Sequence, residues 1–528
     1  MKKGTMIVLV YIPFALLCIF GLAKLLPIMH NRAQKATSDA KDMKGTITIA
    51  VDDWIGYYPL SSGRMKKYMR NEGFILDCKN DGGDYPTRMN NLKNGKLDFA
   101  VVTVDSYILN GMTVDYPGTV IAVLDESKGG DALVAYTNVI QNLDSFKLGD
   151  RTASIPAIAF TPGSPSEHLL KTIAAHFNVP ALRSQNFTKD KRIETKDSVE
   201  AFEKLKTKKV SVAVLWEPNV SKALSLPGVE KIIGTENMTG VIVDILVVNR
   251  DFALKYPERV DLLLRTYFRV LKSYTDSPND LRQDITTELK IQSDSVQKML
   301  DGVAWINLSD NCRRWFGISG VGQVSEQLLV DVIESTTGIL IESGDFKTSP
   351  LPEKDPYRII NRQFIETIYN SGIKNGFANI VAGSGPVPSG VDHLFKVLSD
   401  DQWGRLRSVG SIKVDPIKFQ TGRFELDVSE KEKLDAAVDR LKHYPTFRIL
   451  IGGHTSLLGE TEANKILSQE RADAVVRYLM VTYNIDQNRI RAVGFGGGHP
   501  LSRQTGESDR TYNYRLPRVE LSLLEEPF

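Results

Sequence analysis

The chain has 528 residues, a length that predicts roughly two to four domains of about 150 residues each. Its composition, with 42% hydrophobic and 25% charged residues and a formal net charge of +2, is typical of a globular protein. So neutral a balance offers no basic face for nucleic acid, and no nucleic-acid partner is expected. The three cysteines, Cys18, Cys78 and Cys312, show no metal-ligating spacing, and no cofactor is expected.

The first residues predict a membrane anchor. Lys2 and Lys3 precede an uncharged, mostly apolar run over 6–23, close to the roughly 20 residues that span a bilayer. No small-x-small cleavage site follows directly, so we expect residues 1–30 to form an uncleaved transmembrane signal anchor. A cleaved signal peptide is the alternative. The polar residues 31–44 are expected to form a short tether.

Strand and helix signals then alternate over 45–372. Continuous Val/Ile-rich runs between helical segments predict an α/β fold with its sheet covered on both faces. A Gly/Pro/Ser-rich stretch marks a linker with a short helix over 373–411, and a small α+β unit of βαβαβ order is expected over 412–528. Strands of the central region are expected at 46–52, 97–104, 119–124, 154–160, 210–216 and 240–249.

The C-terminal unit carries several ordered motifs. IGGHTSLLGETEANKILSQERADAVVRYL is followed by NIDQNRIRAVGFGGGHP and then by NYRLPRVELSL. Over about 412–524 these motifs resemble the OmpA C-terminal family of peptidoglycan-binding domains. The resemblance implies a pocket that grips the diaminopimelate of the stem peptide through a charged pair.

Arg471, in the Leu-Ser-x-x-Arg-Ala helix, matches the cationic half of that pair, and a guanidinium fork suits a carboxylate. The family usually reads Gly-His-Thr-Asp where this chain reads Gly-His-Thr-Ser, so Ser456 stands in place of the acid. Losing that charge-assisted bond costs roughly 1–3 kcal/mol. The pocket is therefore expected to bind peptidoglycan weakly or to bind an altered stem, and a domain that has lost its ligand is the alternative. The expected peptidoglycan-binding residues are Phe419, His454, Thr455, Ser456, Asn464, Arg471, Asn513 and Arg515.

Residues 45–372 resemble periplasmic solute-binding proteins of the nitrate, sulfonate and taurine type. The resemblance rests on ITIAVDDWIGYYPL, LKNGKLDFAVVTVDSY, ESKGGDALVA, TPGSPSEHLL and VAVLWEPN in that order. It implies two α/β lobes that close on a small-molecule solute. Lobe one is expected over about 45–145 plus 245–345, and lobe two over about 146–244.

Polar residues follow the predicted strands, where ligands of α/β sheets bind. Ser164 is a predicted N-cap, and Trp54 suits hinge packing as well as ligand contact. Several acids, Asp52, Asp53, Asp105, Asp131 and Asp244, favour a cation or zwitterion over a bare anion. The expected solute-binding residues are Trp54, Tyr57, Thr103, Asp105, Ser127, Asp131, Ser164, Ser166, Trp216, Glu217 and Asp244.

No catalytic motif is found, and the chain is not expected to be an enzyme. The sequence favours a receptor or sensor tethered to peptidoglycan, single-pass in the bacterial inner membrane, with most of the chain in the periplasm. Its expected partners are peptidoglycan, a solute, the inner membrane, and an ABC permease or a signalling membrane protein. The alternatives are a substrate-capture component of an ABC uptake system, or a structural wall anchor with a non-binding middle domain.

Overall fold

The structure is a computed structural model that describes residues 43–146, 155–183, 186–318, 326–374, 395–420, 422–504 and 506–526. Among the described residues, 43–47 together with 66–77 form one unit, and those of 48–65 and 78–526 form a second. The predicted anchor, and the predicted tether up to Asp42, lie outside the residues that the structure describes. Among the helices that the structure describes, none is long and apolar enough to cross a membrane.

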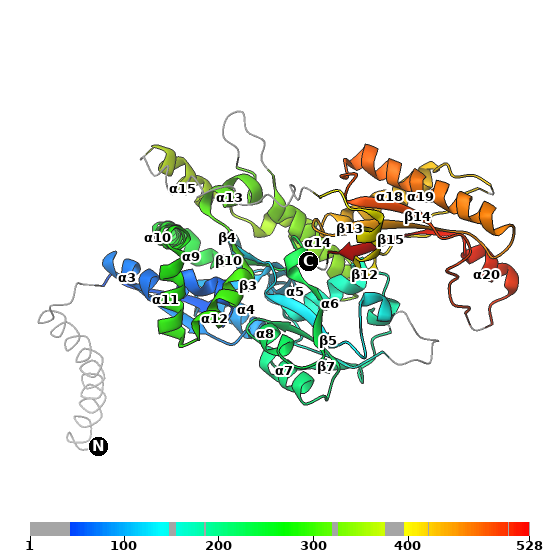
Figure 1. Ribbon diagram of the computed structural model, residues 1–528. Helices are drawn as coiled ribbons and strands as arrows, with labels where there is room; N and C mark the ends of the chain where they lie inside the picture. Colours follow the sequence, from blue (N-terminus) through cyan, green and yellow to red (C-terminus); the bar gives the residue numbers. More distant parts are fainter. Residues whose placement is uncertain are drawn as a thin grey trace, which may run out of the picture. The chain divides into compact units, whose positions relative to one another are not determined.

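Three sheets organise the described chain (Figure 1). The first, which defines lobe one, has the strand order β11-β4-β10-β3-β1-β2. Its strands are β1 (Gly45–Val51), β2 (Phe74–Asn80), β3 (Phe99–Thr103), β4 (Gly118–Ser127), β10 (Val243–Asn249) and β11 (Val303–Trp305). Its helices are α2 (Tyr58–Ser61), α3 (Gly63–Asn71), α4 (Tyr85–Lys93), α5 (Val104–Gly111), α9 (Arg250–Lys255), α10 (Pro257–Asp276), α11 (Pro278–Leu289), α12 (Ser293–Asp301), α13 (Leu308–Asp310), α14 (Leu328–Glu342) and α15 (Gln363–Lys374).

The second sheet, which defines lobe two, has the order β7-β6-β8-β5-β9. Along β5, Ala132 and Val134 enter one apolar cluster with α7 and α8, whereas Leu133 and Ala135 enter another with α6. Both faces are thus covered, as the continuous apolar runs predicted. The elements are β5 (Asp131–Tyr136), β6 (Ile158–Phe160), β7 (Arg192–Glu194), β8 (Val212–Trp216), β9 (Val229–Gly234), α6 (Pro165–His176), α7 (Ser198–Lys206) and α8 (Asn219–Leu224).

The chain crosses between the lobes after β4 and again after β9. Ser127 and Thr235 tie the two crossings together through a 2.8 Å hydroxyl hydrogen bond, and the Gly129 N–H donates to the same threonine. Gly129 has a φ of +115°, which favours glycine. The first crossing lies at 128–130, so the predicted lobe boundary after 145 is wrong. Strand β5 follows β4 after a short Gly-Gly turn, a sequence pattern that is typical of a β-hairpin. In the structure the two strands belong to different sheets.

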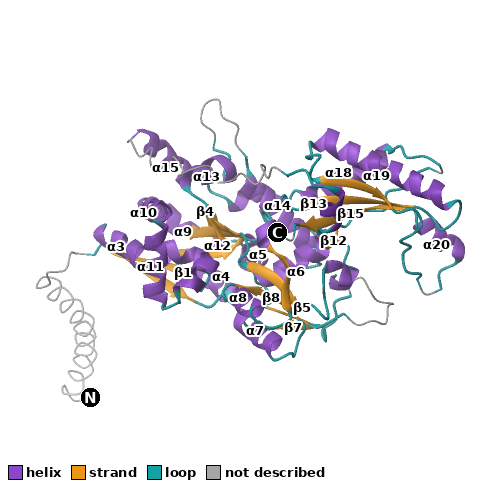
Figure 2. Ribbon diagram, viewed as in Figure 1, coloured by secondary structure: helices purple, strands orange, loops and turns teal. Residues whose placement is uncertain are grey.

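The third sheet, with the order β12-β15-β13-β14, defines the C-terminal domain. Helices α18 and α19 run along one face of it, joined by a hydrogen bond from the Tyr478 hydroxyl to Asp435 (Figure 2). Strand β12 lies inside the predicted linker, where its small polar residues show no apolar pattern. The elements are α17 (Asp400–Gly404), β12 (Arg407–Ser411), α18 (Val428–Leu441), β13 (Arg448–His454), α19 (Thr461–Tyr483), β14 (Ile490–Gly494), α20 (Asp509–Arg515) and β15 (Arg518–Glu525).

The C-terminal domain shares an apolar core with lobe two, and we call this contact the seam. Phe177 at the end of α6 forms a β-bridge with Ile412, and its ring lies 5.2 Å from that of Tyr444. The same cluster of buried residues runs from Leu133 in β5 to Leu523 in β15. Burial of apolar surface therefore stabilises this contact in addition to its hydrogen bonds.

Candidate functional site

A row of polar side chains crosses the centre of the lobe-one sheet. In the antiparallel register Asp244 of β10 lies opposite Thr103 of β3 on one side and opposite Asp125 of β4 on the other. Directly opposed residues place their side chains on the same face of a sheet. All three are almost completely buried, and the Thr103 hydroxyl has no hydrogen-bond partner. The strands thus bring together predicted residues that are far apart in the sequence.

The two acids of this row hold the aromatic residues that follow β1. The Trp54 indole N–H donates to Asp125 at 2.9 Å, and the Tyr57 hydroxyl donates to Asp244. Burial raises the pKa of both acids, and the charge of Asp125 adds to the increase at Asp244. Trp54 also packs against Gly130, where a Cβ would come within 2.1 Å of its ring. Trp54 is therefore part of the hinge.

Asp52 is paired within lobe one. The Arg88 guanidinium, which is fully buried, contacts Asp52 at 3.1 Å and also binds Asp81. Burial raises the pKa of Asp52, although the positive charge of Arg88 opposes that increase. Asp53 accepts a 2.6 Å hydrogen bond from Asn80 at the surface. Asp52 and Asp53, which are adjacent in the sequence, are therefore both bound to other side chains and not available to a solute.

Asp105 and Asp131, like Asp125, each keep one carboxylate oxygen without a hydrogen-bond partner, but neither accepts from an aromatic side chain or forms an ion pair among the described residues. Asp105 opens α5 and is 4% exposed, and Asp131 opens β5 and is 3% exposed. Burial raises the pKa of Asp131 to about 7, and the charges of Asp105 and Glu217 add to the increase. Because Asp105 and Glu217 both raise the pKa of Asp131, their carboxylates lie close enough to interact with it electrostatically.

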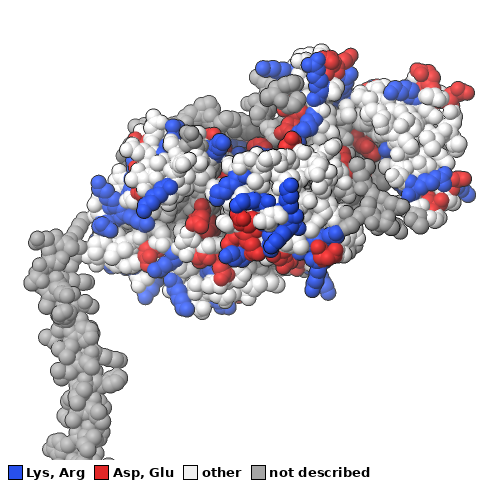
Figure 3. Space-filling view, turned by 60° about the horizontal axis from the view of Figure 1, so that its bottom comes forward, with Lys and Arg blue, Asp and Glu red and all other residues white. Residues whose placement is uncertain are grey.

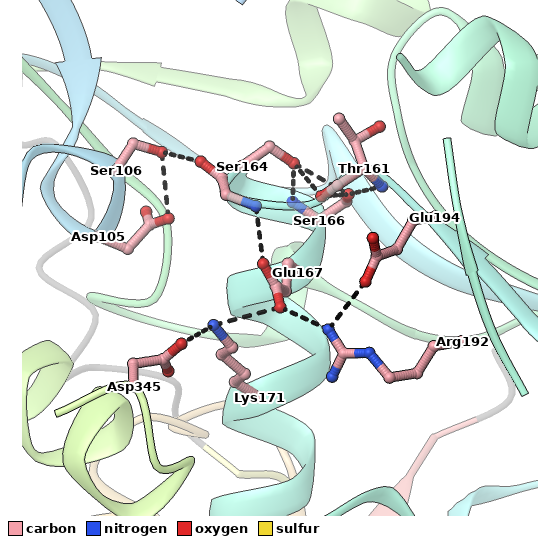
Figure 4. Close-up of polar contacts among 11 residues, drawn as sticks. Asp105, Ser106, Thr161, Ser164, Ser166, Glu167, Lys171, Arg192, Glu194 and Asp345 are labelled. Atoms are coloured by element: carbon pink, nitrogen blue, oxygen red, sulfur yellow. Dashed lines mark hydrogen bonds and ion pairs between the residues drawn. The ribbon is translucent and has the colours of Figure 1, made fainter. Parts of the chain in front are cut away.

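Lobe two faces Asp105 through the loop before α6 (Figure 4). The Ser106 hydroxyl, next to Asp105, donates to the Gly163 carbonyl at 3.3 Å and so joins the two lobes. Ser164 caps α6 as expected, since its hydroxyl accepts from the Ser166 N–H. The Ser166 hydroxyl accepts from the Thr161 N–H at 3.0 Å. Both predicted serines are thus engaged with the backbone of their own loop.

The remaining predicted residues of the central region have structural partners. Glu217 caps α8 by accepting hydrogen bonds from the N–H and hydroxyl of Ser221, and Ser127 belongs to the hinge. The backbone of Trp216 contacts the Ser198 hydroxyl. The open pocket of about 410 Å³ beside α6 is bounded by other residues: Phe160, Glu167, Leu170, Lys171, Ala174, Ala175, Leu182, Arg183, Phe187, Arg192, Glu342 and Ser343.

Sequence reasoning missed Asp125 and His168. The predicted strand stopped at 124, whereas β4 continues through Asp125 to Ser127. An acid directly after an apolar run was the available signal. His168 in α6 is 2% exposed and neither ring nitrogen has a partner, and burial lowers its pKa. Nothing local in the sequence distinguishes it from an ordinary helix residue.

In the C-terminal domain the predicted Arg471 lies under the loop that follows Phe419. Its guanidinium is 5.0 Å from the centre of the Phe419 ring and donates to the Arg423 carbonyl at 3.1 Å. The residue is 5% exposed, and burial lowers its pKa. Among the residues that the structure describes, no carboxylate forms an ion pair with it. The predicted arginine and aromatic residue are therefore brought together, and the arginine has no acidic partner.

Ser456 and Asn464 both contact the loop between β13 and α19. The Ser456 hydroxyl accepts from the Leu458 N–H at 3.4 Å, and the Asn464 amide donates to the Leu458 carbonyl at 2.9 Å. Thr455 is buried with its hydroxyl unpartnered. Ser456 thus lies at the expected turn, where it stabilises the loop.

His454 is a packed residue of β13. Its ring stacks on Phe495 with centres 5.2 Å apart and is 3% exposed. Burial and the charge of Arg518 lower its pKa to about 4, so it is neutral near pH 7.

Arg515 and Asn513 lie in α20. Arg515 forms a bidentate ion pair with Glu507, at 2.9 Å for both bonds. The Asn513 amide N–H donates to the Asp509 carbonyl within its own helix, and its amide oxygen has no partner. Arg515 is therefore satisfied inside the domain, whereas Asn513 keeps an acceptor.

Comparison with known proteins identifies the C-terminal region. Residues 418–514 match the OmpA family. A probable lipoprotein of Escherichia coli, YiaD, is 35% identical over 107 residues, which are 20% of this chain and 47% of that protein. The peptidoglycan-binding protein ArfA of Mycobacterium bovis is 30% identical over 112 residues, 21% of this chain and 34% of ArfA. The matches thus span less than half of these relatives.

Solved structures similar to this chain include periplasmic binding proteins. The sulfonate-binding protein SsuA of Methylobacillus flagellatus covers 64% of this chain and 97% of its own, with a TM-score of 0.45 and 15% identity. The nitrate-binding protein NrtA of Synechocystis covers 65% and 93%, with a TM-score of 0.44 and 13% identity. The chain thus combines a mixed α/β central region built on two sheets with a C-terminal region that matches the OmpA family.

Proposed function

We propose that this protein is a solute-binding receptor or sensor of the bacterial envelope, anchored in the inner membrane and tethered to peptidoglycan. The N-terminal apolar run would hold one end, and the C-terminal domain would bind the wall. Between them the two lobes would close on a small solute and present the closed state to an ABC permease or a signalling membrane protein. The chain would act by binding and not as an enzyme.

The observation that carries this proposal is the group of unpartnered polar atoms where lobe one meets lobe two. Thr103, Asp105 and Asp131 each keep an oxygen without a partner although each residue is at least nine-tenths buried. A buried polar atom without a partner costs about 1–3 kcal/mol, so a group of three calls for an additional ligand. The two chain crossings beside them provide a hinge for closure.

Wall binding is tested by sedimenting the full chain with purified peptidoglycan sacculi. Wild type should sediment, and Arg471→Ala should lose binding by about tenfold or more because the carboxylate of the stem peptide loses its guanidinium. Arg477→Ala, an exposed arginine on the same helix, is the matched control and should bind as wild type does. Equal sedimentation of Arg471→Ala and wild type would contradict the tether.

Ser456→Asp restores the acid that the OmpA family usually has at this position. If Arg471 still holds a stem-peptide carboxylate, the new charge should strengthen sacculus binding roughly 5- to 150-fold. If wild type stays in solution and Ser456→Asp sediments, the domain has lost its ligand through this one substitution. The domain would then be an interaction module.

A structural wall anchor is the second candidate, and the seam favours it. A continuous apolar core between lobe two and the C-terminal domain suits a part that transmits force between wall and membrane. The two functions differ in one measurement, because a passive anchor gains no stability from any small solute, whereas a receptor does.

A further inference from the structure

The acids near the hinge differ in whether an arginine or an aromatic side chain of the protein already binds them. Asp52 is paired with Arg88, and Asp125 and Asp244 accept from Trp54 and Tyr57, although the second oxygen of Asp125 has no partner in the described chain. Asp105 and Asp131 are also buried with one oxygen lacking a donor, and among the described residues neither forms an ion pair or accepts from an aromatic side chain. A buried carboxylate in this state requires a cationic or hydrogen-bond-donating partner.

In the described part of lobe two, two N–H groups before and at the start of α6 that could bind an anion already donate to side chains of the protein. The first turn of a helix offers free N–H groups to a negative ligand, but here the Ser164 hydroxyl accepts from the Ser166 N–H. The carboxylate of Glu167 also accepts from the Gly163 N–H at 2.7 Å. A negative side chain of the protein therefore lies where a bound anion would have to enter.

Two basic side chains of this region are paired with that same acid, whereas the Nε of Arg183, which lines the pocket beside α6, has no partner among the described residues. Arg192 contacts Glu167 at 3.0 Å, and Lys171 contacts it at 3.3 Å and Asp345 at 2.8 Å (Figure 4). Burial opposes ionisation of Glu167, but Lys171, the Gly163 N–H and Arg192 outweigh it and lower its pKa. Binding an anion here would mean breaking these pairs.

We propose that the solute is an organic ammonium compound whose cationic group is held by Asp105 and Asp131 at the junction of the lobes. This inference rests on the proposed solute-binding function. An ammonium carries three N–H donors, which suits two single carboxylate oxygens from opposite lobes and a third acceptor such as the Thr103 hydroxyl. Asp105 comes from α5 of lobe one and Asp131 from β5 of lobe two, so one cation bound by both would stabilise the closed state.

His168 adds a neutral group on the lobe-two side. It lies within electrostatic reach of Asp105, and burial keeps its ring uncharged near neutral pH. A neutral imidazole offers one donor and one acceptor, and both nitrogens are unpartnered. His168 thus presents no competing positive charge and can bind a polar part of the same solute.

The test measures the thermal midpoint of the full chain with small compounds at millimolar concentration. Ethanolamine and putrescine carry ammonium groups, and ethanesulfonate and succinate are anions of matched size. We expect the two amines to raise the midpoint and the two anions to leave it unchanged. Calcium chloride is added as a further probe, and stabilisation by calcium without stabilisation by the amines would overturn the proposal.

Two isosteric variants connect that result to the residues. Asp105→Asn and Asp131→Asn should each weaken amine binding about tenfold or more, because a charge-assisted hydrogen bond is lost while the shape is kept. Asp53→Asn, which alters an acid bound to Asn80 at the surface, is the control and should bind as wild type does. Both site variants are first compared with wild type by circular dichroism, and Asp105→Glu provides a charge-conserving check.

The outcomes separate this inference from the function on which it rests. Stabilisation by the anions alone would overturn the ammonium proposal and leave the solute-binding function standing. Stabilisation by neither group would count against both. Amine binding that both Asn variants retain would show that the cation is held elsewhere and would overturn the assignment of Asp105 and Asp131.

Discussion

Asp131 connects stability to binding at the level of a single side chain. Its folded pKa of about 7 lies above the usual 3.8, so the folded protein takes up a proton in this range and unliganded stability falls as pH rises from about 4 to 7. Asp131→Asn cannot ionise and should escape this loss. We expect the variant to exceed wild type in unfolding free energy by on the order of 2 kcal/mol above pH ~7.5 and to match it near pH ~4.

Urea unfolding of the two proteins across that pH range measures the difference. A constant offset at every pH would mean that the Asn side chain changes packing and not charge. A solute cation would remove part of the same penalty in wild type, which is why we expect amine binding to weaken as pH falls below about 7. The charged groups acting on Asp131 are Asp105, Glu217 and Asp125.

At the scale of elements, the hinge depends on a close approach between the β4–β5 turn and Trp54. Gly130→Ala would place a Cβ within 2.1 Å of the indole ring and should displace it, breaking its hydrogen bond to Asp125. We expect a loss of about 1–3 kcal/mol in unfolding free energy and a change in tryptophan fluorescence. Gly338→Ala in α14 is the control, since nothing lies within 4 Å of its Cβ position, and it should be neutral or slightly stabilising. Equal behaviour of the two variants would refute the hinge role of Trp54.

Two histidines give the seam a dependence on pH. His176 of α6 and His443 stack with ring centres 4.9 Å apart, and His176 bonds the Tyr444 hydroxyl at 2.9 Å. Burial lowers the pKa of both below the usual 6.5, so the unfolded chain binds protons more readily and stability is lost as pH falls below that value. The other charged or titratable groups around the pair are Arg440, His168, Glu126, Asp439 and Lys442.

In denaturant unfolding, the histidine pair should therefore contribute a loss of on the order of 1–3 kcal/mol in stability at pH ~5 relative to pH ~7.5. This contribution is opposite in sign to that of Asp131 and is separated from it by comparing wild type with a histidine variant. His443→Gln should reduce that difference, and His499→Gln, which changes an exposed histidine, should leave it unchanged. An acid loss that persists fully in His443→Gln would place its origin away from the seam.

On the scale of the whole molecule, the shared apolar core predicts that lobe two and the C-terminal domain unfold together. Phe177→Ala removes a fully buried ring from this core and should cost about 3–5 kcal/mol and split the calorimetric transition. Phe252→Ala, a buried phenylalanine of lobe one, is the control, since it should destabilise lobe one without separating the other two parts. A single transition in Phe177→Ala would mean that hydrogen bonds alone maintain the coupling.

Charge on the surface behaves as the composition predicts. Basic and acidic side chains are interspersed on the face shown in Figure 3, in keeping with the net charge of +2. The near-zero net charge was therefore known from the sequence, because net charge is a sum over residues.

The local sequence pattern was sufficient to predict the α/β lobes, the Ser164 helix cap and the OmpA motifs that contain Arg471. Periodicity, caps and motif spacing are properties of short stretches of sequence. The local pattern was insufficient for the first lobe crossing and for β12, whose residues carry no apolar signal. Tertiary structure alone decided which acids are satisfied. Asp244 meets Tyr57 across 187 positions and Asp125 meets Trp54 across 71, whereas no such donor reaches the free oxygens of Asp105 and Asp131 in the described chain. Whether a carboxylate is paired depends on what the fold brings beside it, and no local stretch of sequence contains that information.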